Sequence, residues 1–311
     1  MRVLVFGAGA VGSRFGGALA RAGHEVTLVA RRAHAAAITA SGLLVEGEPG
    51  PPVRLPALER LAPRTTVDVV LLTVKSYDVP DAGRALARDL PGPTPVFALQ
   101  NGLGIVPALV EGLAAGGWSD AGAWVVRGVH TVPARIVGPG VVRATGTGEV
   151  VLGRNPARAV WSEELAGAFR SAGIPTRVVD DIGREEWRKA IVNAAINPVT
   201  ADHGIANGRL VEEPWRGQAR GLLAEALGAA ALEGFRFEPD EAERTLFGVA
   251  RATAANRSSM LEDLEHGRPT EIEAISGAIV EVGRRHGVRM PATERAIVRI
   301  HTREAERRGR A

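Results

Sequence analysis

Three polar residues recur four positions apart in the second half of this 311-residue chain. Lys189, Asn193 and Asn197 lie in the segment 187–198, WRKAIVNAAINP. On a helix, residues with this spacing share one face, so one ammonium group and two amides would face a common volume. A positioned ammonium group can protonate a nascent alkoxide, and amides can orient a carbonyl substrate. The spacing favours carbonyl chemistry, with a solvated polar helix face as the alternative.

Lysine is rare in this chain, which gives its positions weight. Of the 38 basic residues only Lys75 and Lys189 are lysines, and the rest are arginines. Lysine can lose its proton at accessible pH, whereas arginine cannot. The two lysines therefore indicate positions where more than a generic positive charge is needed, with chance survival as the alternative.

A glycine-rich loop follows the first apolar run of the chain. Val3–Phe6 predicts a strand and Val11–Ala22 predicts a helix, which is the context that a dinucleotide-binding fingerprint requires. The loop consists of Gly7, Ala8, Gly9, Ala10, Val11 and Gly12. Its glycines permit a tight turn, a close approach of the pyrophosphate and close packing of helix on strand, and the phosphates bind at the positive end of the helix. The loop predicts nucleotide binding; a glycine-rich turn without a ligand is the alternative.

The next predicted strand, Glu25–Ala30, ends in two arginines. Arg31 and Arg32 follow it where an NAD enzyme usually carries an acid for the ribose hydroxyls. An arginine there can hold a 2′-phosphate through charge-assisted hydrogen bonds. The sequence therefore predicts NADP as the cofactor, with Arg31 as the phosphate ligand and a solvated arginine pair as the alternative.

The first half alternates apolar runs with helical stretches, which predicts a parallel sheet covered by helices. Further strands are expected at 68–74, 95–99 and 176–179, and a helix at 79–89. The glycine-rich segment 124–153, with its alternating valines, predicts antiparallel strands at the edge of the sheet.

The remainder of the chain predicts helices. They are expected at 184–197, 218–234, 239–255 and 271–287. Pro198 disfavours helix at Asn197, which predicts a helix end or a kink there. The expected fold class is α/β, with a Rossmann-type NADP-binding domain over residues 1–180 and an all-α substrate and catalytic domain over 181–311.

Composition excludes several classes of protein. Hydrophobic residues make up 45% and charged residues 23% of the chain, which fits a globular protein and neither a disordered nor a membrane protein. The absence of cysteine excludes disulfides, thiolate metal sites, Fe–S clusters and cysteine nucleophiles. A net charge of +3, without basic stripes interleaved with aromatic residues, argues against nucleic-acid binding. With no membrane-spanning run and no signal-peptide pattern, a cytoplasmic location is expected.

Taken together, the motifs resemble those of the ketopantoate reductases (2-dehydropantoate 2-reductases) over most of the chain. Besides the glycine loop and Arg31, the resemblance rests on the order and spacing of 73–75 (TVK), 100–104 (QNGLG), 187–201, 256–260 (NRSSM) and 270–272 (TEI). It implies NADPH-dependent reduction of 2-dehydropantoate to (R)-pantoate in pantothenate and coenzyme A biosynthesis. Hydride is transferred to the C2 ketone, and Lys189 is the general acid.

The resemblance also implies roles for further residues. Glu271 belongs beside the nicotinamide ribose and the catalytic lysine, and Ser259 binds the substrate carboxylate. The other implied cofactor contacts are Lys75, Asn101 and Ala134, and the other implied substrate contacts are Asn101, Lys189, Asn193 and Asn197. Asn256, three residues before Ser259, could share its helical face toward a cleft between the domains, although capping or packing is the favoured role of Asn256 and Ser258.

Two enzymatic alternatives remain open, namely reduction of another branched 2-oxo acid and an opine-type dehydrogenase. A protein of another class, an NADP-sensing regulator, also fits the glycine loop. The expected partner is a small-molecule 2-oxo acid; a homodimer stays open, and no metal, nucleic acid or membrane is expected.

Overall fold

The protein, described by a computed structural model covering residues 1–155 and 157–308, divides into two units. The first comprises residues 1–100 and 105–182, and the second comprises residues 101–104 and those from 183 onward. Residues 309–311, the end of the expected helical domain, lie outside the described residues. The short segment 101–104 thus belongs with the helical unit although the chain on both sides of it builds the first unit.

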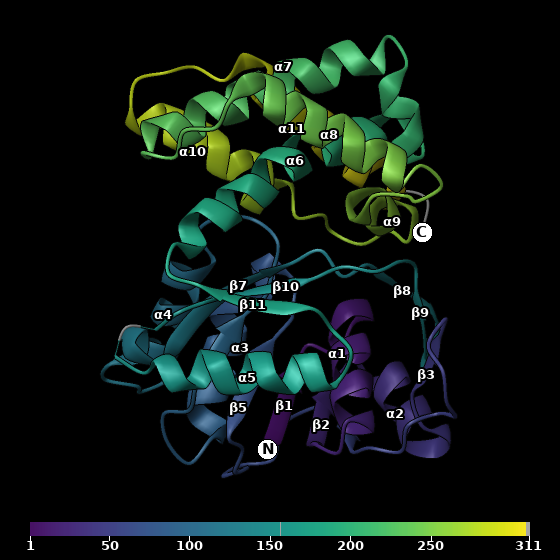
Figure 1. Cartoon of the computed structure of the whole chain (residues 1–311), viewed down its shortest axis with the longest axis vertical. Helices are drawn as coiled ribbons and strands as arrows, with labels where there is room; N and C mark the ends of the chain where they lie inside the picture. The colour runs from purple at the N-terminus through teal and green to yellow at the C-terminus, as the bar shows by residue number, and fades with distance from the viewer. Residues whose placement is uncertain (156, 309–311) are drawn as a thin grey trace. The chain divides into compact units, whose positions relative to one another are not determined.

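The first unit is built on an eight-stranded sheet (Figure 1) with the strand order β11-β10-β7-β6-β5-β1-β2-β4. Its strands are β1 (Arg2–Phe6), β2 (Glu25–Val29), β4 (Ala57–Leu58), β5 (Val69–Leu72), β6 (Val96–Ala98), β7 (Val125–His130), β10 (Val150–Gly153) and β11 (Thr176–Val179). From β4 to β7 all neighbours are parallel. This is the 3-2-1-4-5-6 order of dinucleotide-binding sheets.

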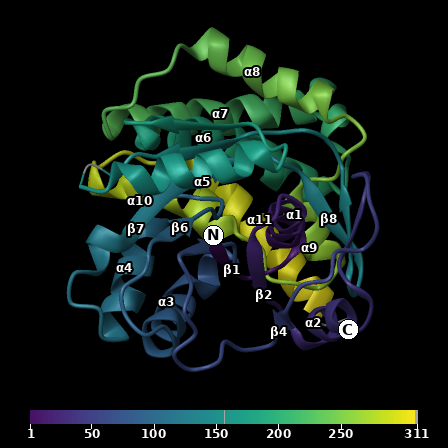
Figure 2. The same ribbon diagram turned by 60° about the horizontal axis from the view of Figure 1, so that its bottom comes forward.

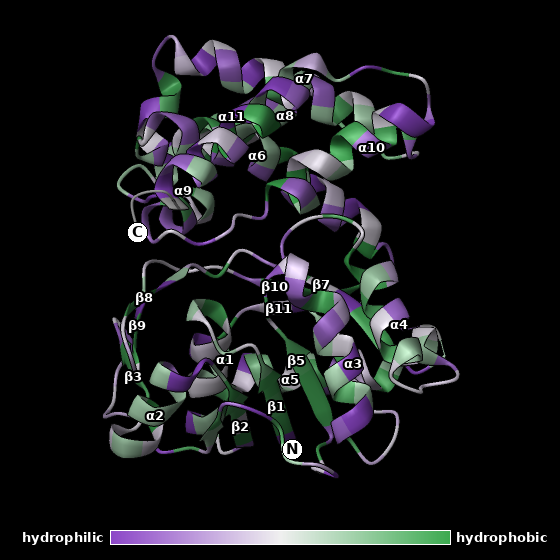
Figure 3. Ribbon diagram, turned by 180° about the vertical axis from the view of Figure 1, so that it is seen from behind, coloured by the Kyte–Doolittle hydropathy of each residue, from purple (hydrophilic) through white to green (hydrophobic). Residues whose placement is uncertain are grey.

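Helices cover both faces of this sheet because the strand residues are apolar on both. They are α1 (Ala10–Arg21), α2 (Arg32–Ser41) and α5 (Ala159–Ser171) on one face, and α3 (Val79–Asp89) and α4 (Ile105–Ala115) on the other. Val3 and Val5 pack into the first core and Leu4 into the second, as alternation along a strand requires. Figure 3 shows β1, β2 and β5 in the colour of hydrophobic residues.

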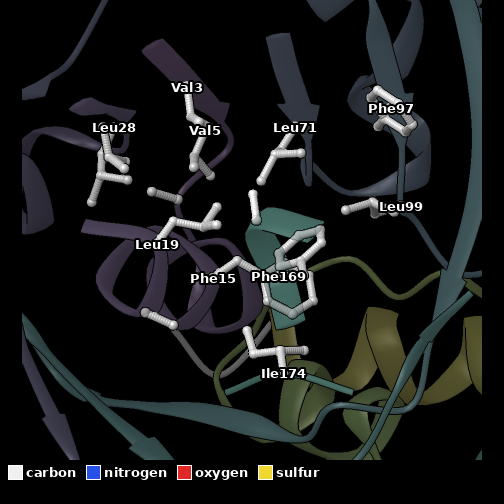
Figure 4. Close-up of a cluster of buried hydrophobic side chains, with 14 of the residues drawn as sticks. Val3, Val5, Phe15, Leu19, Leu28, Leu71, Phe97, Leu99, Phe169 and Ile174 are labelled. Atoms are coloured by element: carbon white, nitrogen blue, oxygen red, sulfur yellow. The ribbon is translucent and has the colours of Figure 1, made fainter. Parts of the chain in front are cut away.

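The first of these cores is centred on two aromatic rings, as Figure 4 shows. Phe15 from α1 and Phe169 from α5 meet edge to face with centroids 5.1 Å apart, and both are fully buried. Because such pairs add to the free energy gained by area burial alone, the two rings hold α1 firmly against α5. The helix that begins at the glycine loop is thereby held in place.

The expectation of antiparallel edge strands over 124–153 is only partly right. β10 does pair antiparallel with β7, but β7 is parallel to β6 inside the main sheet. The hairpin of β8 (Ala134–Gly138) and β9 (Val141–Ala144) leaves that sheet and joins β3 (Leu44–Glu46) in a second, three-stranded sheet. The valine alternation predicted strands correctly, but partner choice depends on β3, which the sequence pattern did not reveal.

The second unit is helical, so the expected fold class is confirmed. Its elements are α6 (Ile182–His203), the 3₁₀ helix η3 (Asn207–Val211), α7 (Trp215–Leu232), α8 (Pro239–Ala252), α9 (Ser259–Glu265), the π-helix η4 (Glu273–Gly277), α10 (Ala278–Arg285) and α11 (Pro291–Arg308). Figures 1 and 2 both show α7 and α8 side by side. No helix in the described part of the chain is long and apolar enough to cross a membrane.

Pro198 predicted a helix end or a kink at Asn197, and the helix end is wrong. Helix α6 continues through Pro198 to His203. Proline lacks the N–H that would bond to the carbonyl of Ala194, but every residue from 194 to 201 is buried in the core of the unit. The burial of these two turns outweighs the loss of one backbone hydrogen bond.

Candidate active site

Hydrogen bonds to β2 and to Thr73, just after β5, hold the glycine loop in place. The backbone N–H groups of Gly7 and Ala8 both donate to the carbonyl of Val29, at 3.0 and 2.7 Å, and the Thr73 hydroxyl donates to the carbonyl of Gly7 at 2.9 Å. Gly7 has φ +101°, and a Cβ there would overlap the backbone nitrogen of Val74. Only glycine fits this turn without strain.

The other two glycines of the motif differ in what surrounds them. A Cβ on Gly12 would overlap the Thr73 hydroxyl and lie 2.8 Å from the carbonyl oxygen of Gly7, whereas a Cβ on Gly9 would meet only that oxygen, at 3.9 Å. Gly9 is exposed and is the N-cap of α1. Open space therefore lies at the positive end of α1, where a phosphate binds to free backbone N–H groups. This cradle fits the pyrophosphate of a dinucleotide.

Arg31 and Arg32 follow β2 but have different surroundings. Arg32 forms an ion pair with Glu59 at 3.2 Å. Arg31 is exposed at the N-cap of α2, and within residues 1–155 and 157–308 its guanidinium has no hydrogen-bond or ion-pair partner. The carbonyl of Arg31 accepts the N–H groups of His34 and Ala35, both at 3.0 Å, so its backbone is fixed while its side chain extends from the surface.

Two other expected cofactor contacts lie in different parts of the first unit. Lys75 is half-buried after β5, and its carbonyl accepts the Asp78 N–H at 2.9 Å. Ala134 opens β8 and pairs with Ala144 across the hairpin. Their contacts with a cofactor stay predictions.

In the helical unit, Lys189, Asn193 and Asn197 all lie on α6, as their spacing predicted. Burial increases along this row: Lys189 and Asn193 are half-buried, and Asn197 is 5% exposed. Among the residues that the structure describes, neither asparagine side chain has a hydrogen-bond partner. Since buried amides are nearly always hydrogen-bonded, the Asn197 amide is a candidate for bonding to a ligand.

The segment 101–104 packs against the start of the π-helix. The Asn101 amide donates to the Glu271 carboxylate at 3.3 Å, and the Leu103 N–H donates to the carbonyl of Ala274 at 2.8 Å. Gly102 has φ +93°, and a Cβ there would lie against the backbone of Ala274. Two residues with expected cofactor roles, Asn101 and Glu271, are thus brought together from positions 170 apart in the sequence. A π-helix often marks a functional site.

The strand end that precedes Asn101 is fixed by a buried arginine that the sequence motifs do not reveal. The Arg127 guanidinium, 6% exposed, donates to the carbonyls of Ala98 and Gln100, at 2.8 and 2.9 Å. Both carbonyls lie at the end of β6 and just beyond it. Arg127 therefore anchors the last residue of β6 and the residue that precedes Asn101.

Helix α11 anchors the chain next to Glu271. No sequence motif indicates this support. The buried carboxylate of Glu304 accepts the Thr270 backbone N–H at 2.8 Å. His301 contacts Glu304 at 3.3 Å and Glu273 at 2.7 Å. Burial raises the pKa of Glu304, but the bonds from Thr270 and His301 outweigh it and lower the pKa overall. Glu304 is therefore an anion that anchors the residue preceding Glu271.

Ser258 caps α9, which confirms its expected role, but the shared face of Asn256 and Ser259 is wrong. The Ser258 hydroxyl accepts the Leu261 N–H at 3.2 Å and contacts the Thr200 hydroxyl at 2.7 Å. Asn256 precedes the helix, and its carbonyl accepts the Asn207 N–H. A stable N-cap at Ser258 starts the helix after Asn256, so the two residues share no face. The Thr200–Ser258 bond instead joins α6 to the start of α9, where Ser259 is exposed.

Comparisons with known proteins find relatives of both units. The family model for ketopantoate reductase PanE/ApbA matches residues 3–157, and the model for its C-terminal part matches residues 181–304. The chain is 34% identical to 2-dehydropantoate 2-reductase of Pyrococcus horikoshii, covering 90% of both chains. It is 37% identical to the enzyme of that name from Halobacterium salinarum, covering 94% of this chain and 95% of the relative. A solved PanE/ApbA family ketopantoate reductase from Ralstonia eutropha superposes with a TM-score of 0.88 at 32% identity, over 99% of this chain and all of the other.

Proposed function

Because the chain belongs to the ketopantoate reductase family, we propose that it reduces 2-dehydropantoate to (R)-pantoate with NADPH, a step of pantothenate and coenzyme A biosynthesis. The relatives that carry this enzyme name match nearly the whole chain, so both units have counterparts in them. One structural observation supports assigning this activity to particular residues. Helix α6 bears Lys189, Asn193 and the buried Asn197 in one row. A protein that only sensed NADP would not need this row.

The first unit supplies most of the cofactor contacts in this proposal. The cradle over Gly9 and the first turn of α1 hold the pyrophosphate, and the exposed guanidinium of Arg31 holds the 2′-phosphate. Lys75 and Ala134 are the other contacts from this unit, whereas the remaining two cofactor residues, Asn101 and Glu271, belong to the helical unit, with Glu271 assigned to the nicotinamide ribose. When bound, NADPH supplies the hydride that reduces the C2 ketone.

Lys189 is the proton donor in this proposal. As hydride reaches C2, negative charge develops on the ketone oxygen, and a nearby ammonium group stabilises that charge before giving up its proton. Glu271 orients the ammonium group.

The substrate is oriented by neutral groups. The amides of Asn193 and Asn197 bond to the hydroxyl and carbonyl oxygens, and Asn101 provides a further contact. The exposed Ser259 hydroxyl, at the first turn of α9, receives the carboxylate. Since the Thr200–Ser258 bond ties α9 to α6, the carboxylate and carbonyl contacts keep a fixed separation. A site of this kind rejects analogues that leave its polar groups unpaired.

The decisive experiment measures NADPH oxidation by the purified protein with a panel of 2-oxo acids. We expect 2-dehydropantoate to give the highest kcat/KM, above unbranched 2-oxo acids and above the aldehyde analogue without a carboxylate. Preference for another branched 2-oxo acid would reassign the substrate within the same chemistry. NADPH binding with no turnover of any member of the panel would favour a sensor and overturn the proposal.

A further inference from the structure

We propose that His34 is a positioning residue for the dinucleotide, because one buried imidazole ring links the glycine loop, the helix that carries Arg31 and the β8–β9 hairpin. The inference rests on the proposed function, since it concerns binding of NADP at that loop. It adds a residue to which neither the glycine motif nor the row on α6 assigns a role.

Three contacts define the His34 network. The Ser13 hydroxyl lies 3.0 Å from Nε2 of His34 and 3.2 Å from the carbonyl oxygen of Ala8. The backbone N–H of Gly140 donates to Nδ1 of His34 at 3.0 Å. Ser13 is fully buried and His34 is 7% exposed. Water is therefore largely excluded from the network, and each polar group in it depends on its protein partner.

The donor and acceptor roles in the network can be assigned in one consistent way. The Gly140 backbone N–H can only donate, so Nδ1 of His34 accepts and carries no proton. In a neutral ring the proton then lies on Nε2, which donates to the Ser13 hydroxyl. That hydroxyl can in turn donate to the Ala8 carbonyl. Burial lowers the pKa of His34, which favours the neutral ring that this arrangement requires.

This assignment makes His34 a support for the loop itself. Ala8 is the second residue of the loop, and the bond to its carbonyl fixes the peptide that leads into Gly9. The backbone N–H of His34 also donates to the carbonyl of Arg31 at 3.0 Å. One residue thus contributes to the position of the peptide before Gly9 and to that of the backbone of Arg31. Because binding is strongest when the ligand groups are already in place, loss of this support should weaken cofactor binding.

Two substitutions separate the halves of the network. In His34→Gln the amide nitrogen reaches the position of Nε2 and can still donate to Ser13, while the bond from Gly140 is lost. In His34→Asn the shorter amide keeps an acceptor for Gly140 and loses the bond to Ser13. Ser13→Ala removes the link to Ala8 directly. The matched control is His24→Gln, at a partly buried histidine for which no hydrogen bond to the loop is seen.

The test is calorimetric titration of each variant with NADP⁺ and with NAD⁺, together with its melting temperature. We expect His34→Asn and Ser13→Ala to raise the Kd of both nucleotides by roughly tenfold, the effect of losing about one hydrogen-bonded contact. His34→Gln should stay within about threefold of wild type, and His24→Gln should leave the Kd unchanged. Both nucleotides should weaken in parallel because they share the pyrophosphate, whereas loss of Arg31 affects NADP⁺ alone.

Equal Kd values for His34→Asn, His34→Gln and wild type would overturn the inference. It would also be overturned if both His34 variants lost the same affinity and that loss tracked their lower melting temperatures. ¹⁵N NMR of the wild-type imidazole provides a measurement that needs no variant. The expected signature is a neutral ring protonated at Nε2, and protonation at Nδ1 would contradict the network. Wild-type protein that fails to bind NADP⁺ would instead overturn the proposed function.

Discussion

The glycine loop and the polar face of α6 are built to hold ligands in opposite ways. At the loop the proposed ligand contacts come from backbone groups. Glycine at positions 7, 9 and 12 leaves the backbone uncovered by side chains. On α6 the backbone is bonded within the helix, so the contacts proposed there come from side chains at a fixed spacing. Adding atoms therefore destroys the first site, whereas removing or exchanging functional groups destroys the second.

The two sites also differ in what holds them in place. The loop depends on hydrogen bonds donated by the Thr73 and Ser13 hydroxyls and on the Val29 carbonyl, which accepts two N–H groups of the loop. These three residues lie outside the motif. The row on α6 depends on burial of the helix in the core of its unit, which includes every residue from 194 to 201. Substitution of a loop glycine with open space around it should therefore lower cofactor affinity without lowering stability. Substitution of a tightly packed loop glycine should lower both.

The largest effect is expected for Lys189→Arg, which keeps the charge on α6 and removes the usable proton. As a general acid Lys189 contributes roughly 10²–10⁴-fold to kcat, and steady-state assays with 2-dehydropantoate should show a loss of that order. The Kd for NADPH, measured by fluorescence titration without substrate, should change little. The control is Arg188→Lys on the next residue, an exposed arginine near Glu185, which should retain full turnover. Near-normal turnover of Lys189→Arg would refute the general-acid role.

Next in size is Gly9→Val, which adds atoms where the structure leaves open space. A Cβ at this position meets only the Gly7 carbonyl oxygen, at an ordinary contact distance of 3.9 Å, so the melting temperature should stay within a few degrees of wild type. The new side chain would displace a phosphate from the first turn of α1, and with charge-assisted bonds contributing about 1.5–3 kcal/mol each, the Kd for NADPH should rise roughly 100-fold. Gly122→Val, at another exposed glycine with open space around it, is the matched control. Unchanged affinity in Gly9→Val would remove the pyrophosphate from this cradle.

Arg31→Ala should give a smaller and more selective loss. A charge-assisted pair contributes about 1.5–3 kcal/mol, so the KM for NADPH should rise on the order of tenfold while the KM for NADH stays nearly constant. Arg32→Ala is the matched control, because Arg32 is engaged with Glu59. Equal use of both cofactors by the wild-type enzyme would contradict the assignment of Arg31.

Local patterns in the sequence predicted the parts of the molecule that depend on near neighbours. The glycine loop, helix α3 and the row on α6 follow from turns, periodicity and spacing within a few residues. The run-on of α6 through Pro198 and the partner of the β8–β9 hairpin depend on packing that no local pattern contains. The valines of the hairpin were correctly interpreted as strand residues and the helix end at Pro198 was wrong, and in both cases the tertiary surroundings decided the outcome.

The same division applies to the candidate site. Asn101 and Glu271 were each indicated by a motif, but their contact across 170 positions was not. His34, Arg127, Thr200 and Glu304 act through backbone groups or other side chains, and residues of those types are common throughout the chain. Since one histidine or glutamate carries no spacing signal, such supports become visible only when the fold brings their partners to them.

The smallest effect on turnover is expected for Glu304→Gln, which tests whether the side-chain site also depends on a backbone anchor. The substituted amide would still accept the Thr270 N–H but would carry no charge. A neutral hydrogen bond is only moderately weaker than a charged one, so Glu271 should stay nearly in place. We therefore expect kcat to fall by less than about threefold. The effect should appear in stability instead.

The pH dependence of that stability gives the sign of the contribution. The pKa of Glu304 is lower in the folded protein than its ordinary value of 4.5, so its stabilising effect is fully present above that ordinary value and is lost as pH falls through the folded pKa. The pKa of His301 is raised, mainly by Glu273, so the contribution of His301 is lost as pH rises through its own folded pKa. The melting temperature of Glu304→Gln should therefore lie below that of wild type near neutral pH and approach it in acid. Glu306→Gln, at an exposed position on the same helix, should follow the wild-type curve. If the curves of Glu304→Gln and wild type stayed parallel into acid, the anchor would not depend on the charge of Glu304.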